Sequence, residues 1–219
     1  MLALAAAGIA EGRWLRAEAQ SAGRGRMGRA WHSAPGNLYA STLIRLQRGD
    51  PPASTLALVA AVALADTVQG YAPGFALNIK WPNDLLIAGA KLAGILLERS
   101  GEAVVIGVGV NLAHHPDGLG RRVTSLAAHG VMPDPEQFCA DLAVQFARWV
   151  ARWRSEGLAP IRLAWLALAH PPGTALVANL GDGESLEGLF DGLTEDGALR
   201  LRLADGSVRV IHAGDVFLI

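Results

Sequence analysis

LNIKWPNDLLIAGAKLAGILLERSGEAVVIGVGVNL, residues 77–112, decides the fold, because strand-like apolar runs follow one another in it without an intervening helix. The predicted strands cover residues 77–81, 85–87, 91–99 and 102–111, and the predicted turns lie at Pro82–Asp84, Ala88–Gly89 and Ser100–Gly101. Successive strands joined by short turns pair antiparallel, so this stretch predicts an antiparallel sheet.

Further strands and several helices are predicted on both sides of this stretch. We expect strands at residues 14–19 and 37–46, and helices at residues 2–10, 54–68, 134–157 and 159–169. The helix at 54–68 is apolar on nearly every side, so it should be buried, and Ser54 can cap it. Asp134 followed by Pro135 is typical of a helix start, and the aromatic residues spaced along that helix indicate a side that faces the core.

A small second domain is predicted at the C-terminal end. Pro171–Gly173 ends the last helix and marks the boundary between a domain of residues 1–170 and one of residues 171–219. Short strands are predicted at residues 175–179, 185–191, 198–203 and 207–211, with turns such as GDG at 181–183. This spacing is typical of a small β-barrel of the size of an SH3-like module.

The net charge and the cysteine content narrow the class of protein. The formal net charge is -1, whereas a nucleic-acid-binding protein is more often basic, so we expect no nucleic-acid partner. Cys139 is the only cysteine, which excludes an intrachain disulfide and fits a reducing, cytoplasmic setting. The longest apolar run, residues 56–65, is too short to span a bilayer, and the first ten residues lack the basic charge of a secretory signal. We therefore expect a cytoplasmic protein without a membrane partner.

A loop of unusual composition precedes the second predicted strand. Residues 23–29 contain three glycines and three arginines. Glycines allow backbone N–H groups to approach an anion, and arginine offers a planar donor fork for a carboxylate or phosphate. The loop therefore predicts an anion-binding site, although a flexible basic surface loop would have the same composition.

A second candidate site lies in KWPNDLLIAGAKLAGILLE, residues 80–98. Asp84 and Lys91 flank a predicted hairpin, so their side chains could converge, either in a functional site or in a surface ion pair worth less than about 1 kcal/mol. Strict alternation along the strand would place Lys91 on the same face as Ala93 and Ile95. If that face is the core, the lysine needs an anionic partner or ligand. The alternate glycines of GVGVNL, residues 107–112, allow close approach by a flat ligand or another backbone.

Three motifs resemble those of biotin protein ligases in order and spacing. They are QSAGRGRMGRAW (20–31), KWPNDLLIAGAKLAGILLE (80–98) and GVGVNL (107–112). The resemblance extends over essentially the whole chain. It implies a mixed, largely antiparallel sheet with helices on one side, similar to lipoate ligases, and a C-terminal SH3-like barrel. It also implies that biotin and ATP, with Mg²⁺, form biotinyl-5′-AMP, and that the biotinyl group passes to a lysine of a biotin carboxyl carrier protein. A homodimer is compatible with it.

The resemblance also implies roles for individual residues. Lys91 would bridge the carboxylate and the phosphate, and Asp84 would hold Mg²⁺ or orient the incoming amine. Arg26 would retain the adenylate and act in catalysis. The other residues implied to contact biotin or the adenylate are Gln20, Gly23, Arg24, Gly25, Trp31, Gly94 and Asn111.

Two features of the family are expected to be missing. The sequence leaves no room for an N-terminal DNA-binding domain, so operator binding is not expected. The D-S-T-N element of the family is absent and the helix at residues 2–10 begins without a cap, so we expect a chain truncated at its N-terminus that binds biotin poorly. Three alternatives remain: a lipoate- or octanoyl-transferring relative, a protein that binds biotin or adenylate without turnover, and, least favoured by the overall charge, a nucleic-acid-binding protein.

Overall fold

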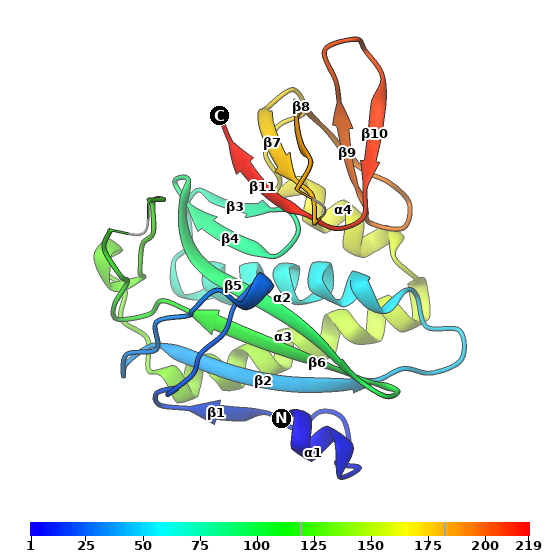
Figure 1. Cartoon of the computed structure of the whole chain (residues 1–219). Helices are drawn as coiled ribbons and strands as arrows, with labels where there is room; N and C mark the ends of the chain where they lie inside the picture. The colour runs from blue at the N-terminus through cyan, green and yellow to red at the C-terminus, as the bar shows by residue number, and fades with distance from the viewer. Residues whose placement is uncertain (119, 182) are drawn as a thin grey trace.

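The computed structural model describes residues 1–118, 120–181 and 183–219. The expected turn at 181–183 includes one residue outside these ranges. A six-stranded sheet in the order β1-β2-β6-β5-β4-β3 forms the larger part of the protein (Figure 1), and all of its strand pairs are antiparallel. Its strands are β1 (Leu15–Ala17), β2 (Leu38–Arg45), β3 (Leu77–Lys80), β4 (Asp84–Ile87), β5 (Ala90–Ser100) and β6 (Ala103–Val110).

Helices cover one face of this sheet, as predicted. They are α2 (Leu56–Tyr71), α3 (Pro135–Glu156) and α4 (Ala159–Ala167), and Figure 1 shows α2 and α3 crossing behind the strands. Alternate residues of β6 such as Ile106 and Val108 pack into the core with α2, and the buried aromatic side of α3 includes Phe138 and Trp153. The opposite face of the sheet is not covered by α2, α3 or α4; we call it the helix-free face, and it is open to form a site.

The helix starts were predicted with mixed success. Asp134 caps α3 as expected, because its carboxylate accepts hydrogen bonds from the backbone N–H groups of Glu136 and Gln137. Ser54, in contrast, does not cap α2: a single 3-10 turn at Ala53–Thr55 precedes the helix, and no side chain caps it. Among the described residues, the stretch 53–71 is long and apolar enough to cross a membrane, but most of it is buried in the core.

A β-bulge changes the face on which Lys91 lies. On β4 the partners Leu85 and Leu86 are adjacent, whereas their partners on β5, Ala93 and Lys91, are separated by Leu92. The extra residue reverses the alternation, so Lys91 extends over the helix-free face while Ala93 joins the core. The prediction that Lys91 shares a face with Ala93 and Ile95 is therefore wrong.

The C-terminal part is a five-stranded antiparallel sheet in the order β10-β9-β8-β7-β11, stacked above the larger sheet in Figure 1. Its strands are β7 (Ala175–Asn179), β8 (Ser185–Leu193), β9 (Leu199–Arg202), β10 (Val208–Ile211) and β11 (Asp215–Leu218). The sequence did not reveal β11, an edge strand that pairs only with β7. The domain boundary at residue 170 stays a prediction.

The N-terminal segment is tied to the rest of the protein by a cluster of charges. The short helix α1 (Leu2–Ala6) packs through Ala5 on the helix-free face of the large sheet. Farther along, Glu11 accepts two hydrogen bonds from Arg154 at the end of α3, at 2.7 and 3.1 Å. The same glutamate accepts the backbone N–H of Arg45, and Arg154 also lies 3.4 Å from Asp50. This cluster joins three segments that are distant in the sequence.

Replacing Glu11 with glutamine is expected to lower the free energy of unfolding at pH 7 by about 1–2 kcal/mol, because one bidentate, half-buried ion pair is lost. The hydrogen bonds from Arg154 hold the pKa of Glu11 below its usual value. A carboxyl group with a lowered pKa stabilises the folded state above its unfolded pKa of about 4.3, and this contribution is lost as the pH falls through the folded pKa. Urea unfolding should therefore show a difference at pH 7 that shrinks at about pH 3. The exposed Glu18→Gln variant is the control, and an unchanged stability of Glu11→Gln at pH 7 would contradict the prediction.

Candidate active site

The candidate site is a cavity on the helix-free face of the large sheet. Its floor is formed by β5 and β6, where Gly94, Gly107 and Gly109 have no side chain above the backbone. The loop of residues 20–31 forms the roof, and one wall combines the turn after β3 with β11 of the C-terminal sheet. The site therefore lies between the two sheets.

Trp31 lies directly against the glycine floor. A Cβ atom at Gly109 would lie 2.7 Å from Cε2 of Trp31, and one at Gly94 would lie 3.2 Å from Cζ3. The ring therefore needs glycine at 109, where a side chain would force it to move. The tryptophan is held by its loop, because its backbone N–H donates to the carbonyl of Gly23 at 2.9 Å. The sequence predicted that a flat ligand or another backbone approaches the glycines of residues 107–112 closely. In the structure the side chain of Trp31 makes such an approach at Gly109.

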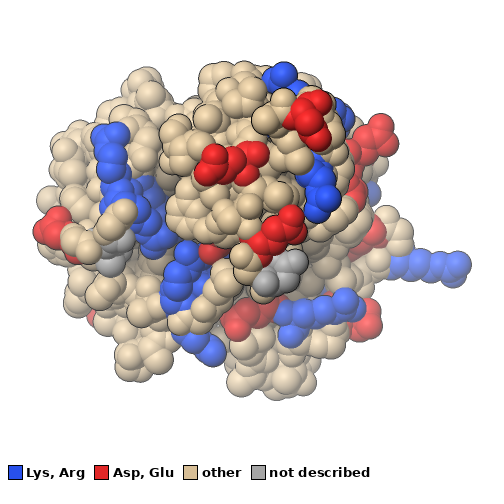
Figure 2. All heavy atoms as spheres, turned by 45° about the horizontal axis from the view of Figure 1, so that its top comes forward, with Lys and Arg blue, Asp and Glu red and all other residues tan. Residues whose placement is uncertain are grey.

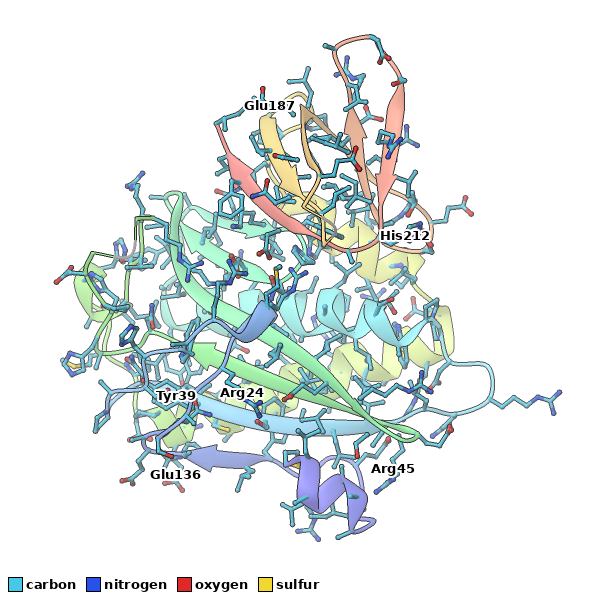
Figure 3. All side chains as sticks on the ribbon, viewed as in Figure 1. Arg24, Tyr39, Arg45, Glu136, Glu187 and His212 are labelled. Atoms are coloured by element: carbon cyan, nitrogen blue, oxygen red, sulfur yellow. The ribbon has the colours of Figure 1, made fainter. Side chains whose placement is uncertain are left out.

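The loop itself is folded back as a small hairpin. The backbone N–H of Gly25 donates to the carbonyl of Arg29 at 2.7 Å, and Met27 at the tip has a positive φ of 54°. Gly23 is required by its neighbours, since a Cβ atom there would lie 2.6 Å from Oγ of Ser33. Figure 3 labels Arg24 of this loop and Tyr39 of the underlying β2, and both line the cavity.

Lys91, Asp84 and Lys80 form a largely buried charged triad at the base of the cavity. The Nζ atom of Lys91 lies 2.5 Å from Oδ1 of Asp84, and Nζ of Lys80 lies 3.1 Å from Oδ2. Only 13% of the Lys91 side chain and 8% of the Asp84 side chain are exposed, which rules out an ordinary surface ion pair. Burial alone would raise the pKa of Asp84, but the two ammonium groups outweigh it and lower the pKa. Burial lowers the pKa of Lys91, and Asp84 opposes that effect.

The C-terminal edge strand β11 holds the cations of the site from the other side. Asp215 lies 3.4 Å from Arg26 and 2.7 Å from Arg29, and Arg26 also donates to the carbonyl of Gly214 at 3.0 Å. Lys80 donates to the carbonyl of Val216 at 3.0 Å. Sequence reasoning missed these contributions because the short strand at 215–218 gave no signal of its own. The acidic residue within this short C-terminal segment was the available clue.

The cavity has an excess of positive charge. Its cationic side chains are Arg24, Arg26, Arg29, Lys80, Lys91 and Arg121, and its acidic ones are Asp84, Glu98 and Asp215. The formal excess is three positive charges, which favours an anionic ligand. Figure 2 shows Lys and Arg side chains gathered beside the C-terminal part on the face turned to the viewer. Within the part of the chain that the structure describes, no group of three His, Cys, Asp or Glu side chains could hold a metal ion.

Most of the predicted site residues meet in this cavity, but two do not line it. Those that line it are Gln20, Arg24, Gly25, Arg26, Trp31, Asp84, Lys91 and Gly94. Gly23 belongs to the roof loop but packs against Ser33 and Trp31 and does not line the cavity. Asn111 is buried beyond the end of β6, where its amide donates to the carbonyl of Thr124 at 3.0 Å. This placement makes Asn111 a support for the segment at 122–124 rather than a lining residue.

Comparisons with known proteins agree with the geometry. The profile of the Biotin/lipoate A/B protein ligase family matches residues 9–111, and the Biotin protein ligase C terminal domain matches residues 177–219. The biotin--[acetyl-CoA-carboxylase] ligase of Paracoccus denitrificans is 44% identical over 97% of this chain and 92% of its own length. The bifunctional ligase/repressor BirA of Bacillus subtilis (strain 168) is 34% identical over 95% of this chain and 66% of its own length.

Solved structures show the same fold. The biotin protein ligase of Aquifex aeolicus in complex with biotin and ATP superposes with a TM-score of 0.87, covering 97% of this chain and 91% of that chain at 22% identity. The similarity in sequence to the Paracoccus ligase extends over nearly the full length of both proteins. The chain therefore belongs to the biotin protein ligase family.

Proposed function

We propose that this chain is an ATP-dependent biotin–protein ligase that forms biotinyl-5′-AMP and transfers biotin to a lysine of a biotin carboxyl carrier protein. The observation that carries this proposal is the buried contact between Lys91 and Asp84 at the base of a cationic cavity roofed by the loop of residues 20–31. A cation held in this way can move from Asp84 to an anionic substrate without leaving the site.

In the first half-reaction, a carboxylate oxygen of biotin bonds to the α-phosphorus of ATP, and pyrophosphate leaves with the electron pair of the broken P–O bond. Two unit anions about 4 Å apart repel each other by roughly 1 kcal/mol in water and roughly 4 kcal/mol near a protein surface. Lys91 and Arg26 offset this repulsion and stabilise the charge that develops in the transition state. Their positions at the base and roof of the cavity suit groups that contact both reactants.

Biotin binds over the glycine floor in this proposal. The open backbone at Gly107 admits a flat bicyclic ring, and Trp31, which covers Gly94 and Gly109, provides an apolar wall beside it. Gln20 at the edge of the cavity supplies a polar side chain for the ureido group, and it already accepts a hydrogen bond from Ser33 at 2.9 Å. Closure of the loop over the adenylate excludes water from an activated acyl group.

In the second half-reaction, the neutral amine of the acceptor lysine attacks the acyl carbon. The bond from this carbon to the phosphate oxygen breaks, AMP leaves with the electron pair, and the nitrogen loses one proton to solvent as the amide forms. Asp84 orients the amine, since its carboxylate lies at the base of the cavity and Lys80 keeps one of its oxygens in place when Lys91 turns toward the adenylate. The same pair of residues therefore contributes to both half-reactions.

The residues present do not form a resident magnesium site. Asp84 is the carboxylate at the base of the cavity, and both of its oxygens are engaged by ammonium groups. Mg²⁺ favours one or two carboxylates combined with substrate phosphates, so we propose that it enters as part of the MgATP substrate. The expectation that Asp84 holds Mg²⁺ is not supported by its contacts.

The proposal is tested by incubating the purified chain with ATP, Mg²⁺ and either biotin or lipoate, together with a biotin carboxyl carrier domain or a lipoyl domain. We expect one biotinylated lysine on the biotin carboxyl carrier domain, detected by mass spectrometry, and no labelling with lipoate. Lipoyl transfer would favour the lipoate-transferring relative. Biotin binding measured by calorimetry without any labelling would identify a protein that binds without turnover.

Replacing Gly109 with alanine is expected to weaken biotin binding by at least about tenfold, because the new Cβ atom displaces Trp31 from the floor. The same substitution should cost much less in a Trp31→Ala background, where no ring is displaced. Calorimetric titration of the wild type, the two single variants and the double variant measures this coupling. Equal losses from Gly109→Ala in both backgrounds would show that Trp31 is not the group that requires the glycine.

A further inference from the structure

Arg121 is a cation that lines the cavity and has no role in the reaction as described so far. Lys80 and Lys91 are paired with Asp84, while Arg26 and Arg29 are paired with Asp215. Within the described ranges, the lining cations that remain without a recorded ion pair are Arg24 and Arg121. Arg24 belongs to the roof loop. Arg121 comes from a different part of the chain, so it requires its own explanation.

The backbone beside Arg121 is fixed to the base of the site. The backbone N–H of Lys91 donates to the carbonyl of Arg122 at 2.9 Å, and the N–H of Thr124 donates to the carbonyl of Lys91 at 2.9 Å. The buried amide of Asn111 holds the carbonyl of Thr124 from the other side. This anchoring explains why the polar side chain of Asn111 is buried, and it sets the position from which Arg121 extends into the cavity.

The side chain of Arg121 is close enough to Lys91 to affect it electrostatically. Burial is the main cause of the lowered pKa of Lys91, and the positive charge of Arg121 adds to that effect. Two like charges placed together in this way are unfavourable in an empty site and are compensated when a polyanion binds. Arg121 is exposed to solvent and lines the cavity, so its guanidinium can reach a polyanion that binds beside Lys91.

We propose that Arg121 binds the two terminal phosphates of ATP and stabilises the pyrophosphate as it leaves, an inference that rests on the proposed function. When the carboxylate oxygen of biotin bonds to the α-phosphorus, the bond from that phosphorus to its bridging oxygen breaks. The electron pair, and therefore negative charge, moves onto the pyrophosphate. An arginine beside Lys91 offers a donor fork to these oxygens, whereas Lys91 itself contacts the reacting carboxylate and α-phosphate.

The inference predicts that Arg121 matters in one half-reaction only. Arg121→Gln should slow biotin-dependent pyrophosphate release by about 10- to 100-fold, the effect of one charged contact. It should also weaken inhibition by added inorganic pyrophosphate by a similar factor. Transfer of biotin from chemically prepared biotinyl-5′-AMP to the carrier domain should stay near the wild-type rate, because no pyrophosphate takes part in that step. Arg121→Lys should restore part of the lost activity.

Arg122→Gln is the matched control. The side chain of Arg122 lies toward Gly89 rather than in the cavity, and the substitution keeps the carbonyl that accepts from Lys91. It should leave both half-reactions unchanged. Equal slowing of both half-reactions by Arg121→Gln, or no slowing of either, would overturn the inference. If the wild-type chain itself releases no pyrophosphate with biotin and ATP, the proposed function fails instead, and the two outcomes are thereby distinguished.

Discussion

Replacing Lys91 with methionine is expected to lower the rate of biotin-dependent adenylate formation by at least about 100-fold, the size of one lost transition-state contact. The variant keeps most of the aliphatic stem and removes the charge that offsets the repulsion between carboxylate and phosphate. The fold should survive, because Lys80 remains paired with Asp84 at 3.1 Å and the buried carboxylate is not left alone.

The measurement is a continuous assay of pyrophosphate release, with the melting temperature of each variant determined in parallel. Leu86→Met, at the position on β4 that pairs with Lys91, serves as a control for local packing and should retain activity. Turnover by Lys91→Met near the wild-type rate would remove Lys91 from the catalytic residues. A large fall in its melting temperature would indicate that the charge is needed for the fold.

Replacing Arg26 with glycine is expected to speed the release of biotinyl-5′-AMP by about 10- to 100-fold, because a charge-assisted contact to the adenylate is lost. Arg26 is held over the cavity by Gly214 and Asp215 of the C-terminal part, so the substitution also loosens the roof loop. Release of an activated intermediate into solution should make labelling less selective for the carrier lysine.

Met27→Gly separates the loss of charge from the gain in flexibility. Met27 is exposed and has a positive φ, so glycine fits its backbone conformation and adds flexibility without removing a charge. Stopped-flow dissociation should therefore be fast for Arg26→Gly and near wild type for Met27→Gly. Equal dissociation rates for Arg26→Gly and the wild type would show that Arg26 does not retain the intermediate.

The strands and helices were predictable where local patterns decide them. The hairpins of residues 77–112, the cap at Asp134 and the buried helix after Thr55 follow from turn residues, capping and apolar runs. The bulge at Leu92 was not predictable, because one extra residue leaves the apolar composition of the strand unchanged. It nevertheless reverses the face of the sheet on which Lys91 lies. Strand alternation therefore identified a lysine in need of a partner but assigned it to the wrong face.

The candidate site was predictable as a set of motifs but not as a set of contacts. The sequence brought Asp84 and Lys91 together across their hairpin. It gave no indication that Lys80 holds the second oxygen of Asp84, or that β11 forms a wall of the cavity. The contacts of the C-terminal segment with Lys80 and Arg26 join residues more than 100 positions apart, and their geometry depends on how the two sheets pack. The buried position of Asn111 likewise depends on the segment at 122–124, which has no periodic pattern.

Pyrophosphate release in the absence of any acceptor protein tests the central claim most directly. With ATP and Mg²⁺ present, we expect release only when biotin is added, and we expect biotinyl-5′-AMP to remain bound to the protein after gel filtration. This result would mean that the cavity between the two sheets activates a carboxylate by adenylation. Release that is independent of biotin, or biotin binding without any release, would contradict the assignment of Lys91, Arg26 and Arg121 to this chemistry.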